Sequence, residues 1–305
     1  MEHGIGTWSG HREGAALLED GFQERIDPSA RGISLDDAPI AASTIPLRGA
    51  QLFGRLVKDA CGHPVPLRDF SLFHRWVMVH GDKWCFAPHF CSGNLRAEES
   101  EIPEEFSSWL GWSTSEVARR TLASSNPTCR SLGLACLKAA LERPEEASER
   151  DSFEILEPLA ERMRTLVIGC FPQAMIWQER GWRTTVLEPG PSGDVVWPNC
   201  AAVGSAELVV ASGSILLGGW LRDLVRHTPR AKARILVGPT VPPSPSLFRM
   251  GVHGLGFTEV ADPGALAEYF RHGAMDLRGA PQGALRKFHW SCRESFVADL
   301  LRSTL

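Results

Sequence analysis

Four turns rich in glycine, proline and serine could together form a ligand site in the second half of the chain. They follow short apolar runs and begin at Gly169, Glu188, Ser212 and Gly238. Open α/β sheets bind small ligands at the carboxyl ends of their parallel strands, so these turns would meet at one edge of a sheet. The predicted ligand-binding residues are Gly169, Phe171, Pro172, Glu188, Ser212, Gly213, Ser214, Gly238, Pro239 and Thr240, with Asn126 and His253 in addition.

The first two turns have part of the pattern of a dinucleotide site. Glu188 follows Gly169 by nineteen residues, a spacing that suits an acid bound to ribose hydroxyls. Phe171 and Pro172, however, stand where a glycine loop would have to approach a pyrophosphate, and proline offers no N–H to it. NAD and FAD are therefore not expected. A nucleoside ligand without pyrophosphate, such as S-adenosylmethionine, stays open, as does a Glu188 that only binds nearby loop N–H groups.

The turn at Gly238 continues into a proline-rich loop that ends at Pro245 and carries four prolines. Proline lowers the entropy of the unfolded chain, so this loop would be a rigid wall beside the sheet edge. A helix is expected to begin near Ser246, where free N–H groups could hold a carboxylate or phosphate. The alternative is a stiff connector without a ligand. Ser212-Gly213-Ser214 could present hydroxyls in the same way, but it lacks the Gly-x-Ser-x-Gly pattern of a hydrolase nucleophile elbow.

A second possible site is a metal site formed by Cys85, His89 and Cys91. On a strand these three positions share one face, and two thiolates with an imidazole suit zinc or copper. Pro88 would disturb that strand, and the spacing matches no zinc-finger pattern. Buried structural cysteines with a hydrogen-bonded histidine are the alternative. His289 and Cys292 are spaced to meet on one helical turn, although packing explains them as well.

The composition favours small ligands over macromolecules. The 305 residues include 32 basic and 36 acidic side chains, so the net charge of −4 gives no basic field for nucleic acid or anionic lipid. No apolar run reaches the roughly 20 residues that span a bilayer, and the first thirty residues lack the apolar core of a signal peptide. The eight cysteines form no Cys-x-x-Cys pair and are expected to be mostly reduced. We expect a cytoplasmic protein that binds a small molecule or metal ion, with a homodimer left open.

The order of predicted elements indicates an α/β protein with two domains. Residues 1–45 form an expected loose leader, 46–145 a small α+β domain, 155–276 a Rossmann-like ligand-binding domain, and 277–305 a tail ending in an amphipathic helix. In the small domain the patterns predict a helix ending at Cys61, strands at 70–79 and 84–90, and helices at 115–123 and from Pro127 to before Pro144. A charged connector, residues 142–154, separates the two domains.

Strands and helices alternate in the second domain. Strands are expected at 165–168, 184–187, 208–211, 234–237 and 256–260, and helices at 174–180, 216–227, 246–250 and 263–272. Such alternation is typical of a mainly parallel sheet with helices on both faces.

The turn sequences also resemble a known family. Residues 166–172, 186–189, 208–214 and 236–242, with Pro245, Leu247, Phe248, Gly251 and Gly254, look like the heavy-metal chelation proteins, formerly a domain of unknown function. Residues 123–126 and 132–135 resemble the small N-terminal domain of that family. The resemblance implies an enolase N-terminal-like domain packed against a Rossmann-like domain, with a site in the cleft between them. Lys138-Ala139 departs from the pattern, because relatives tend to have an Asn-Ala pair there.

From these observations we expect a protein that binds a transition metal (iron, copper or zinc) or a small metal-chelating metabolite in the interdomain cleft. The alternative is a biosynthetic enzyme that acts in the same cleft on an amino-acid-derived or metal-chelating metabolite. No catalytic residue is assigned, because no acid–base pair or nucleophilic triad follows from local spacing.

Overall fold

The computed structural model describes residues 45–62, 64–89, 105–188 and 201–303. Residues 43–305 form one compact unit, to which all the described elements belong. Residues 1–44 of the expected leader lie outside the described part. None of the described helices has the length and apolar character needed to cross a membrane.

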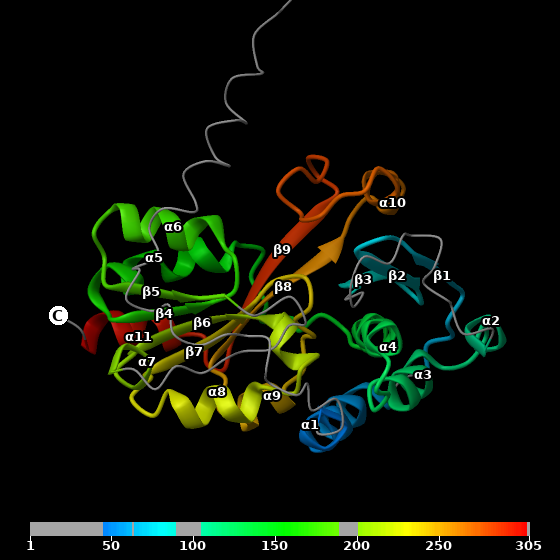
Figure 1. Ribbon diagram of the computed structural model, residues 1–305, viewed down its shortest axis with the longest axis horizontal. Coiled ribbons are helices and arrows are strands. Elements are labelled where there is room, and N and C mark those ends of the chain that lie inside the picture. The colour runs from blue at the N-terminus through cyan, green and yellow to red at the C-terminus, as the bar shows by residue number, and fades with distance from the viewer. Residues whose placement is uncertain (1–44, 63, 90–104, 189–200, 304–305) are drawn as a thin grey trace, which may run out of the picture. The chain divides into compact units, whose positions relative to one another are not determined.

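A six-stranded, mostly parallel sheet forms the centre of the second half of the chain (Figure 1). Its strands, in spatial order, are β5 (Thr184–Leu187), β4 (Thr165–Ile168), β6 (Leu208–Ser212), β7 (Ala233–Val237), β8 (Gly254–Val260) and β9 (Leu285–Ser291). The first five are parallel and β9 runs antiparallel to β8. The predicted α/β class with a mainly parallel sheet is confirmed.

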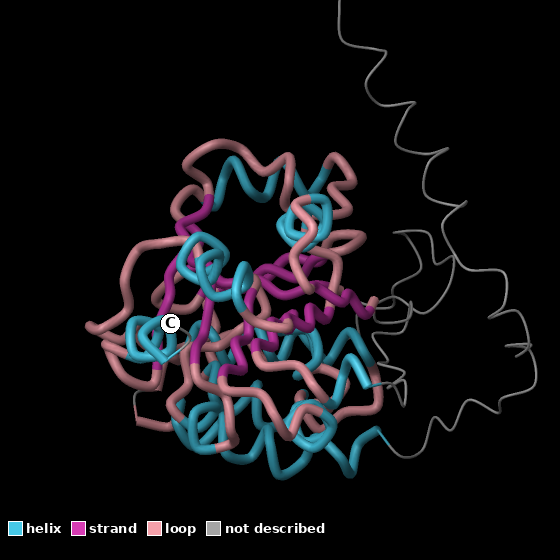
Figure 2. The backbone as a smooth tube through the Cα atoms, turned by 90° about the vertical axis from the view of Figure 1, so that its left-hand side faces the viewer, coloured by secondary structure: helices cyan, strands magenta, loops and turns pink. Residues whose placement is uncertain are grey.

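Helices cover both faces of this sheet, which explains why its inner strands are apolar on both sides. In β4, Leu166 and Ile168 pack on one side with the core of the first half of the chain, and Val167 packs on the other. The face of the sheet that carries Val167 is covered by α5 (Ser152–Arg162), α6 (Pro172–Glu179) and α11 (Phe296–Ser303). The opposite face, with Leu166 and Ile168, is covered by α7 (Ala201–Gly204), the 3₁₀ turn η2 (Gly213–Leu216), α8 (Leu221–His227) and α9 (Ser246–Arg249). Figure 2 shows the strands between the two sets of helices.

A small antiparallel sheet belongs to the first half of the chain. It comprises β1 (Asp69–Leu72), β2 (Trp76–His80) and β3 (Trp84–Pro88), and its helices are α1 (Ile45–Ala60), α2 (Glu105–Ser108), α3 (Thr114–Thr121) and α4 (Pro127–Ala140). One face of the sheet packs on α4. The other meets α10 (Pro263–Arg271), where the Trp76 ring stacks on Phe270 at 5.0 Å and Trp76 Nε1 donates to Ala274 O at 2.9 Å. The small sheet is therefore packed between two helices that lie far apart in sequence.

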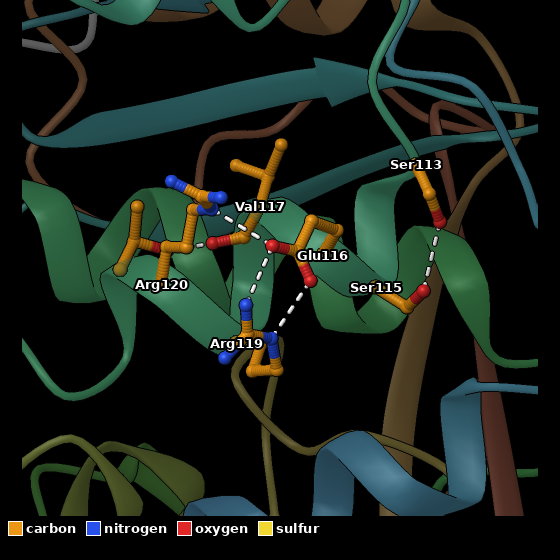
Figure 3. A network of polar contacts seen from close by, with 7 residues as sticks. Ser113, Ser115, Glu116, Val117, Arg119 and Arg120 are labelled. Atoms are coloured by element: carbon orange, nitrogen blue, oxygen red, sulfur yellow. Dashed lines mark hydrogen bonds and ion pairs between the residues drawn. The ribbon is translucent and has the colours of Figure 1, made fainter.

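The exposed side of α3 carries a compact ionic network (Figure 3). The Glu116 carboxylate accepts hydrogen bonds from Arg119 at 2.7 Å and from Arg120 at 2.8 Å. Hydrogen bonds from these two arginines lower the pKa of Glu116 to about 2. These contacts stabilise the solvent face of the helix, while Val117 on its opposite side is buried in the core.

Several sequence predictions differ from the structure. The single strand expected at 70–79 is two strands, β1 and β2, which pair antiparallel across a turn in which Phe73 N donates to Trp76 O at 2.7 Å. The helix expected at 216–227 is divided into η2 and α8, because Gly219 takes φ +73° between them. Helix α5 and strand β9 were not predicted. The expected tail 277–305 thus supplies a full strand of the main sheet.

Candidate functional site

The carboxyl ends of β4, β5, β6 and β7 lie at one edge of the main sheet. Ile168 pairs with both Leu187 and Ala211, and Ser212 pairs with Val237, so these parallel strands end nearly level. The turns that begin at Gly169, Glu188, Ser212 and Gly238 therefore follow neighbouring strand ends, as the sequence predicted. Pro189 and Gly190, which complete the second turn, lie outside the described residues.

The turns after β4, β6 and β7 pack against each other, and glycine makes this contact feasible. Gly169 and Gly238 have φ values of +120° and +119°, which side-chain-bearing residues rarely adopt. A Cβ on Gly169 would lie 3.0 Å from Ser212 Cβ, and one on Gly213 would lie 2.8 Å from Val241 N. The β6 turn thus contacts the turns on either side of it.

The polar groups of these turns are partly satisfied within the protein. Ser212 Oγ accepts hydrogen bonds from Ser214 N at 3.3 Å and from Ser214 Oγ at 2.9 Å, which caps η2. Thr240 is buried at 2 % exposure beside Gly213. The Phe171 ring packs on Phe153 with centroids 5.0 Å apart, and Pro172 begins α6. These residues chiefly shape the edge of the sheet.

Two exposed side chains at the same edge carry metal-binding chemistry. Glu188 is exposed directly after β5, and Cys170 is an exposed free thiol directly after Gly169 at the end of β4. Strands β4 and β5 are neighbours, and Gly169 N donates to Leu187 O at 2.9 Å. Sequence reasoning treated Cys170 only as one of eight cysteines expected to be mostly reduced. Its position one residue after a strand-ending glycine was the signal that could have singled it out.

The first turn of α9 is already occupied by a carboxylate of the protein. Asp59 Oδ2, on α1, accepts from Ser246 N at 2.9 Å and from Ser244 Oγ, and Asp59 Oδ1 accepts from Arg249 at 3.1 Å. Burial alone would raise the pKa of Asp59, but the hydrogen bonds from Ser244 and Ser246 and the Arg249 charge lower it overall. The expectation of free N–H groups near Ser246 is therefore wrong. Helix α1 holds the end of the proline-rich loop instead.

Lys138 on α4 holds the other end of the same loop, and sequence reasoning gave it no role. Its Nζ donates to Pro239 O and, at 3.0 Å, to Phe86 O, and it lies 5.0 Å from the centre of the Phe86 ring. The residue is 3 % exposed. Burial lowers the pKa of Lys138 to about 8. A buried ammonium group therefore lies directly beside the turn that follows β7.

The structure places His253 away from these turns. Its backbone N donates to Arg234 O at 2.7 Å, and its Nδ1 accepts from Arg234 N at 3.0 Å. Arg234 lies near the beginning of β7, so His253 is at the amino-terminal edge of the sheet, opposite the turns. Its ring stacks on Phe296. The prediction that His253 reaches the site is wrong, because β8 runs parallel to β7 and begins directly after His253.

Asn126 has a capping role at the start of α4. Its Oδ1 accepts from Thr128 N at 2.8 Å and, more weakly, from Cys129 N at 3.4 Å. Asn126 is therefore the N-cap of α4, and the helix begins at Pro127 as predicted. The carbonyl oxygen of the side chain is therefore engaged by its own helix.

The alternative metal site at Cys85, His89 and Cys91 gains no support. Cys85 is buried in the core, where burial raises the pKa of its thiol, and Cys91 lies outside the described residues. His89 Nε2 contacts Thr128 Oγ1 at 2.7 Å and Nδ1 contacts Phe73 O at 3.2 Å, so both ring nitrogens have partners. Across the described ranges, no three His, Cys, Asp or Glu residues are grouped closely enough to hold a metal. Pro88 ends β3 on the sheet edge and still pairs with Trp76.

His289 belongs to strand β9, so it does not share a helical turn with Cys292, and the packing alternative remains. Its Nδ1 contacts Ser152 Oγ at 2.9 Å, and its Nε2 contacts Ser291 Oγ at 2.8 Å. Ser152 begins α5 and lies against Gly256, where a Cβ would be 2.2 Å from Ser152 Oγ. Burial lowers the pKa of His289 to about 4. A neutral imidazole therefore joins α5 to the edge strand of the main sheet.

A comparison with known families finds a match for the part of the chain that carries these turns. Residues 151–283 match the DUF364 family. The description of that family is "Putative heavy-metal chelation", and the matched DUF364 segment contains all the turns of the candidate site. The resemblance noted from the turn sequences is thereby confirmed for this part of the chain.

Solved DUF364 structures share the fold of this chain. One from Desulfitobacterium hafniense DCB-2 is 21 % identical with a TM-score of 0.62, and covers 80 % of this chain and 98 % of its own. One from Pyrococcus horikoshii is 19 % identical with a TM-score of 0.58, and covers 79 % of this chain and 99 % of its own. Both are described as proteins of unknown function. No curated protein matches the chain.

Proposed function

We propose that this protein binds a transition metal, or a small chelating metabolite together with its metal, at the turns that follow β4 to β7. The observation that carries the proposal is the mutual packing of the Gly169, Ser212-Gly213 and Gly238 turns at the carboxyl edge of the sheet. Preorganised loops on rigid strands suit ligand binding. The DUF364 description supports a metal as part of the ligand.

Cys170 and Glu188 are the proposed protein ligands of the metal. A thiolate and a carboxylate at neighbouring strand ends suit zinc, copper or iron, because these metals accept sulfur donors. Two protein donors leave most of the coordination sphere open. A chelating metabolite would supply the remaining donor atoms, which agrees with the lack of a three-residue metal cluster among the described residues.

We further propose that the first half of the chain forms one side of the site, as the interdomain cleft expected from the sequence requires. Two of its helices contact the proline-rich loop: α4 through Lys138 to Pro239, and α1 through Asp59 to Ser244 and Ser246. These contacts hold both ends of a loop that borders the proposed ligand. The remaining residues of the β4 to β7 turns would contact the ligand through their backbone and hydroxyl groups.

The second candidate is an enzyme that acts on a nucleoside-bearing substrate such as S-adenosylmethionine. The position of Glu188 favours it, because an acid at the end of the strand next to the Gly169 turn can bind a ribose diol. Calorimetric titration with S-adenosylmethionine tests this candidate. Micromolar binding that Glu188→Gln abolishes would favour it over metal binding.

Metal analysis and titration of the untagged protein test the first proposal. We expect stoichiometric uptake of zinc or copper, alone or as the citrate complex, and a loss of about tenfold or more in affinity in Cys170→Ser and Glu188→Gln. Cys292→Ser is the matched control, because Cys292 is also an exposed free thiol but lies after β9. Less than roughly 0.1 equivalent of bound metal, with no uptake on titration, contradicts the proposal.

A further inference from the structure

Among the residues that the structure describes, the charges that act on Lys138 do not balance. The carboxylate that acts on Lys138 is Glu259 on β8, and Glu259 already pairs with Arg143 at 2.8 Å and with Lys83 at 3.6 Å. The Glu259 carboxylate is thus already engaged in ion pairs with two other cations. Lys138 is the most deeply buried of the three cations, at 3 % exposure. A net positive charge remains beside the Gly238-Pro239 turn.

The other titratable groups near Lys138 leave this imbalance unchanged. Cys85 on β3 and Cys136 on α4 are buried thiols, and burial raises the pKa of both, so they stay neutral at physiological pH. Lys83 adds positive charge. The carbonyl groups of Phe86 and Pro239 solvate the ammonium without neutralising it. Desolvated charges inside proteins are normally paired, so an unbalanced one indicates a missing anion.

We infer that the ligand of the proposed site is an anion, and that Lys138 is the positioning residue whose buried charge favours it. Lys138 acts across the Pro239 turn, because its contacts with the two carbonyl groups keep it below the loop surface. The chemical class is a small polycarboxylate, free or as a metal complex, since carboxylates both chelate metals and balance the local charge. This inference rests on the proposed function for the location of the site, and adds the charge of the ligand.

The test is calorimetric titration with citrate as the probe, with and without zinc, at about pH 7 and about pH 9. The pKa of Lys138 is about 8, so raising the pH removes its charge in the wild type without changing the chain. We expect citrate affinity to fall by roughly tenfold in the wild type. Lys138→Arg should keep its affinity at both pH values, because a guanidinium does not lose its proton in this range. Lys138→Met should bind citrate weakly at both.

Lys58→Met is the control, because Lys58 is an exposed residue of α1 and should leave citrate affinity unchanged. Thermal unfolding of each variant checks that it folds, and the pH series of the wild type needs no variant. Two results would overturn the inference. One is equal citrate affinity in the wild type and a folded Lys138→Met. The other is the same pH dependence of citrate affinity in the wild type and Lys138→Arg. An absence of citrate binding would also overturn it.

The zinc arm separates this inference from the proposed function. Zinc uptake that is independent of citrate and of Lys138 would uphold metal binding and refute the anionic ligand. Citrate binding that depends on Lys138 without any zinc uptake would uphold the anionic ligand and refute the metal.

Discussion

Acid should destabilise this protein through His289 in particular. The imidazole is 5 % exposed between Ser152 and Ser291, and burial lowers its pKa from the usual 6.5 to about 4. The unfolded chain therefore takes up a proton at a higher pH than the folded chain does. Stability contributed by the neutral ring is complete above about pH 6.5 and is lost as the pH falls toward 4.

The size of this loss follows from the two pKa values. The free energy of unfolding falls by about 3 kcal/mol once the pH is below both pKa values of His289. Each tenfold difference in proton affinity between the folded and unfolded chain is worth ~1.4 kcal/mol. Between about pH 7.5 and about pH 5 the loss attributable to His289 is about 2 kcal/mol. His89, which is buried, and His253, which is partly buried, also have pKa values that burial lowers, so they add losses of the same sign.

Urea unfolding of the wild type and His289→Gln isolates the contribution of this one histidine. Glutamine keeps hydrogen-bonding groups near Ser152 and Ser291 but does not titrate. We expect the variant to be less stable near neutral pH, and to lose about 2 kcal/mol less than the wild type on acidification to about pH 5. Equal losses in the two proteins, within ~0.5 kcal/mol, would refute the buried neutral imidazole.

Three further predictions concern the loops and the core. Asp59→Asn should speed amide hydrogen exchange in residues 244–249, because the loop loses its charged acceptor; exchange as slow as in the wild type would show that Asp59 does not hold the loop. Gly213→Ala should destabilise by roughly 1–3 kcal/mol in urea, since its Cβ would meet Val241 N at 2.8 Å; an unchanged midpoint would contradict the close packing of the two turns. Cys85→Ser should cost roughly 1–3 kcal/mol by burying a hydroxyl, with metal uptake intact; lost uptake with normal stability would restore Cys85 as a ligand.

The sequence was most informative where local pattern and tertiary role agree. Strands β4, β6 and β7 are short, mostly apolar runs because both faces of the sheet are covered there, and each ends at a marked turn. The predicted start of a helix at Pro127 was right for the same reason, since the proline and the Asn126 cap act locally. These elements placed the predicted turns together at the carboxyl ends of the parallel strands.

Other elements depend on contacts that local patterns do not contain. Strand β9 exposes Arg286 and Lys287 in succession and buries Phe288 and His289 in succession, so the alternation expected of a strand is absent. Helix α5 contains Pro158 and follows a charged connector. The turn between β1 and β2 has no glycine or proline to mark it.

The parts of the site that sequence reasoning missed are long-range contacts. Lys138 meets Pro239 across 101 positions of the chain, and Asp59 meets Ser246 across 187. His253 was misplaced for a different reason, because a residue that directly precedes a parallel strand lies at the edge of the sheet opposite the carboxyl-end turns. The ends of such contacts carry no shared motif, so only the folded chain reveals them.

Anomalous diffraction from crystals soaked with zinc and citrate tests the central claim most directly, since it locates the metal without depending on a variant. The account predicts one main peak at the carboxyl edge of the sheet, within coordination distance of Cys170 Sγ or the Glu188 carboxylate. A main peak beside Cys85 and His89, or no peak in crystals that have taken up citrate, would contradict it.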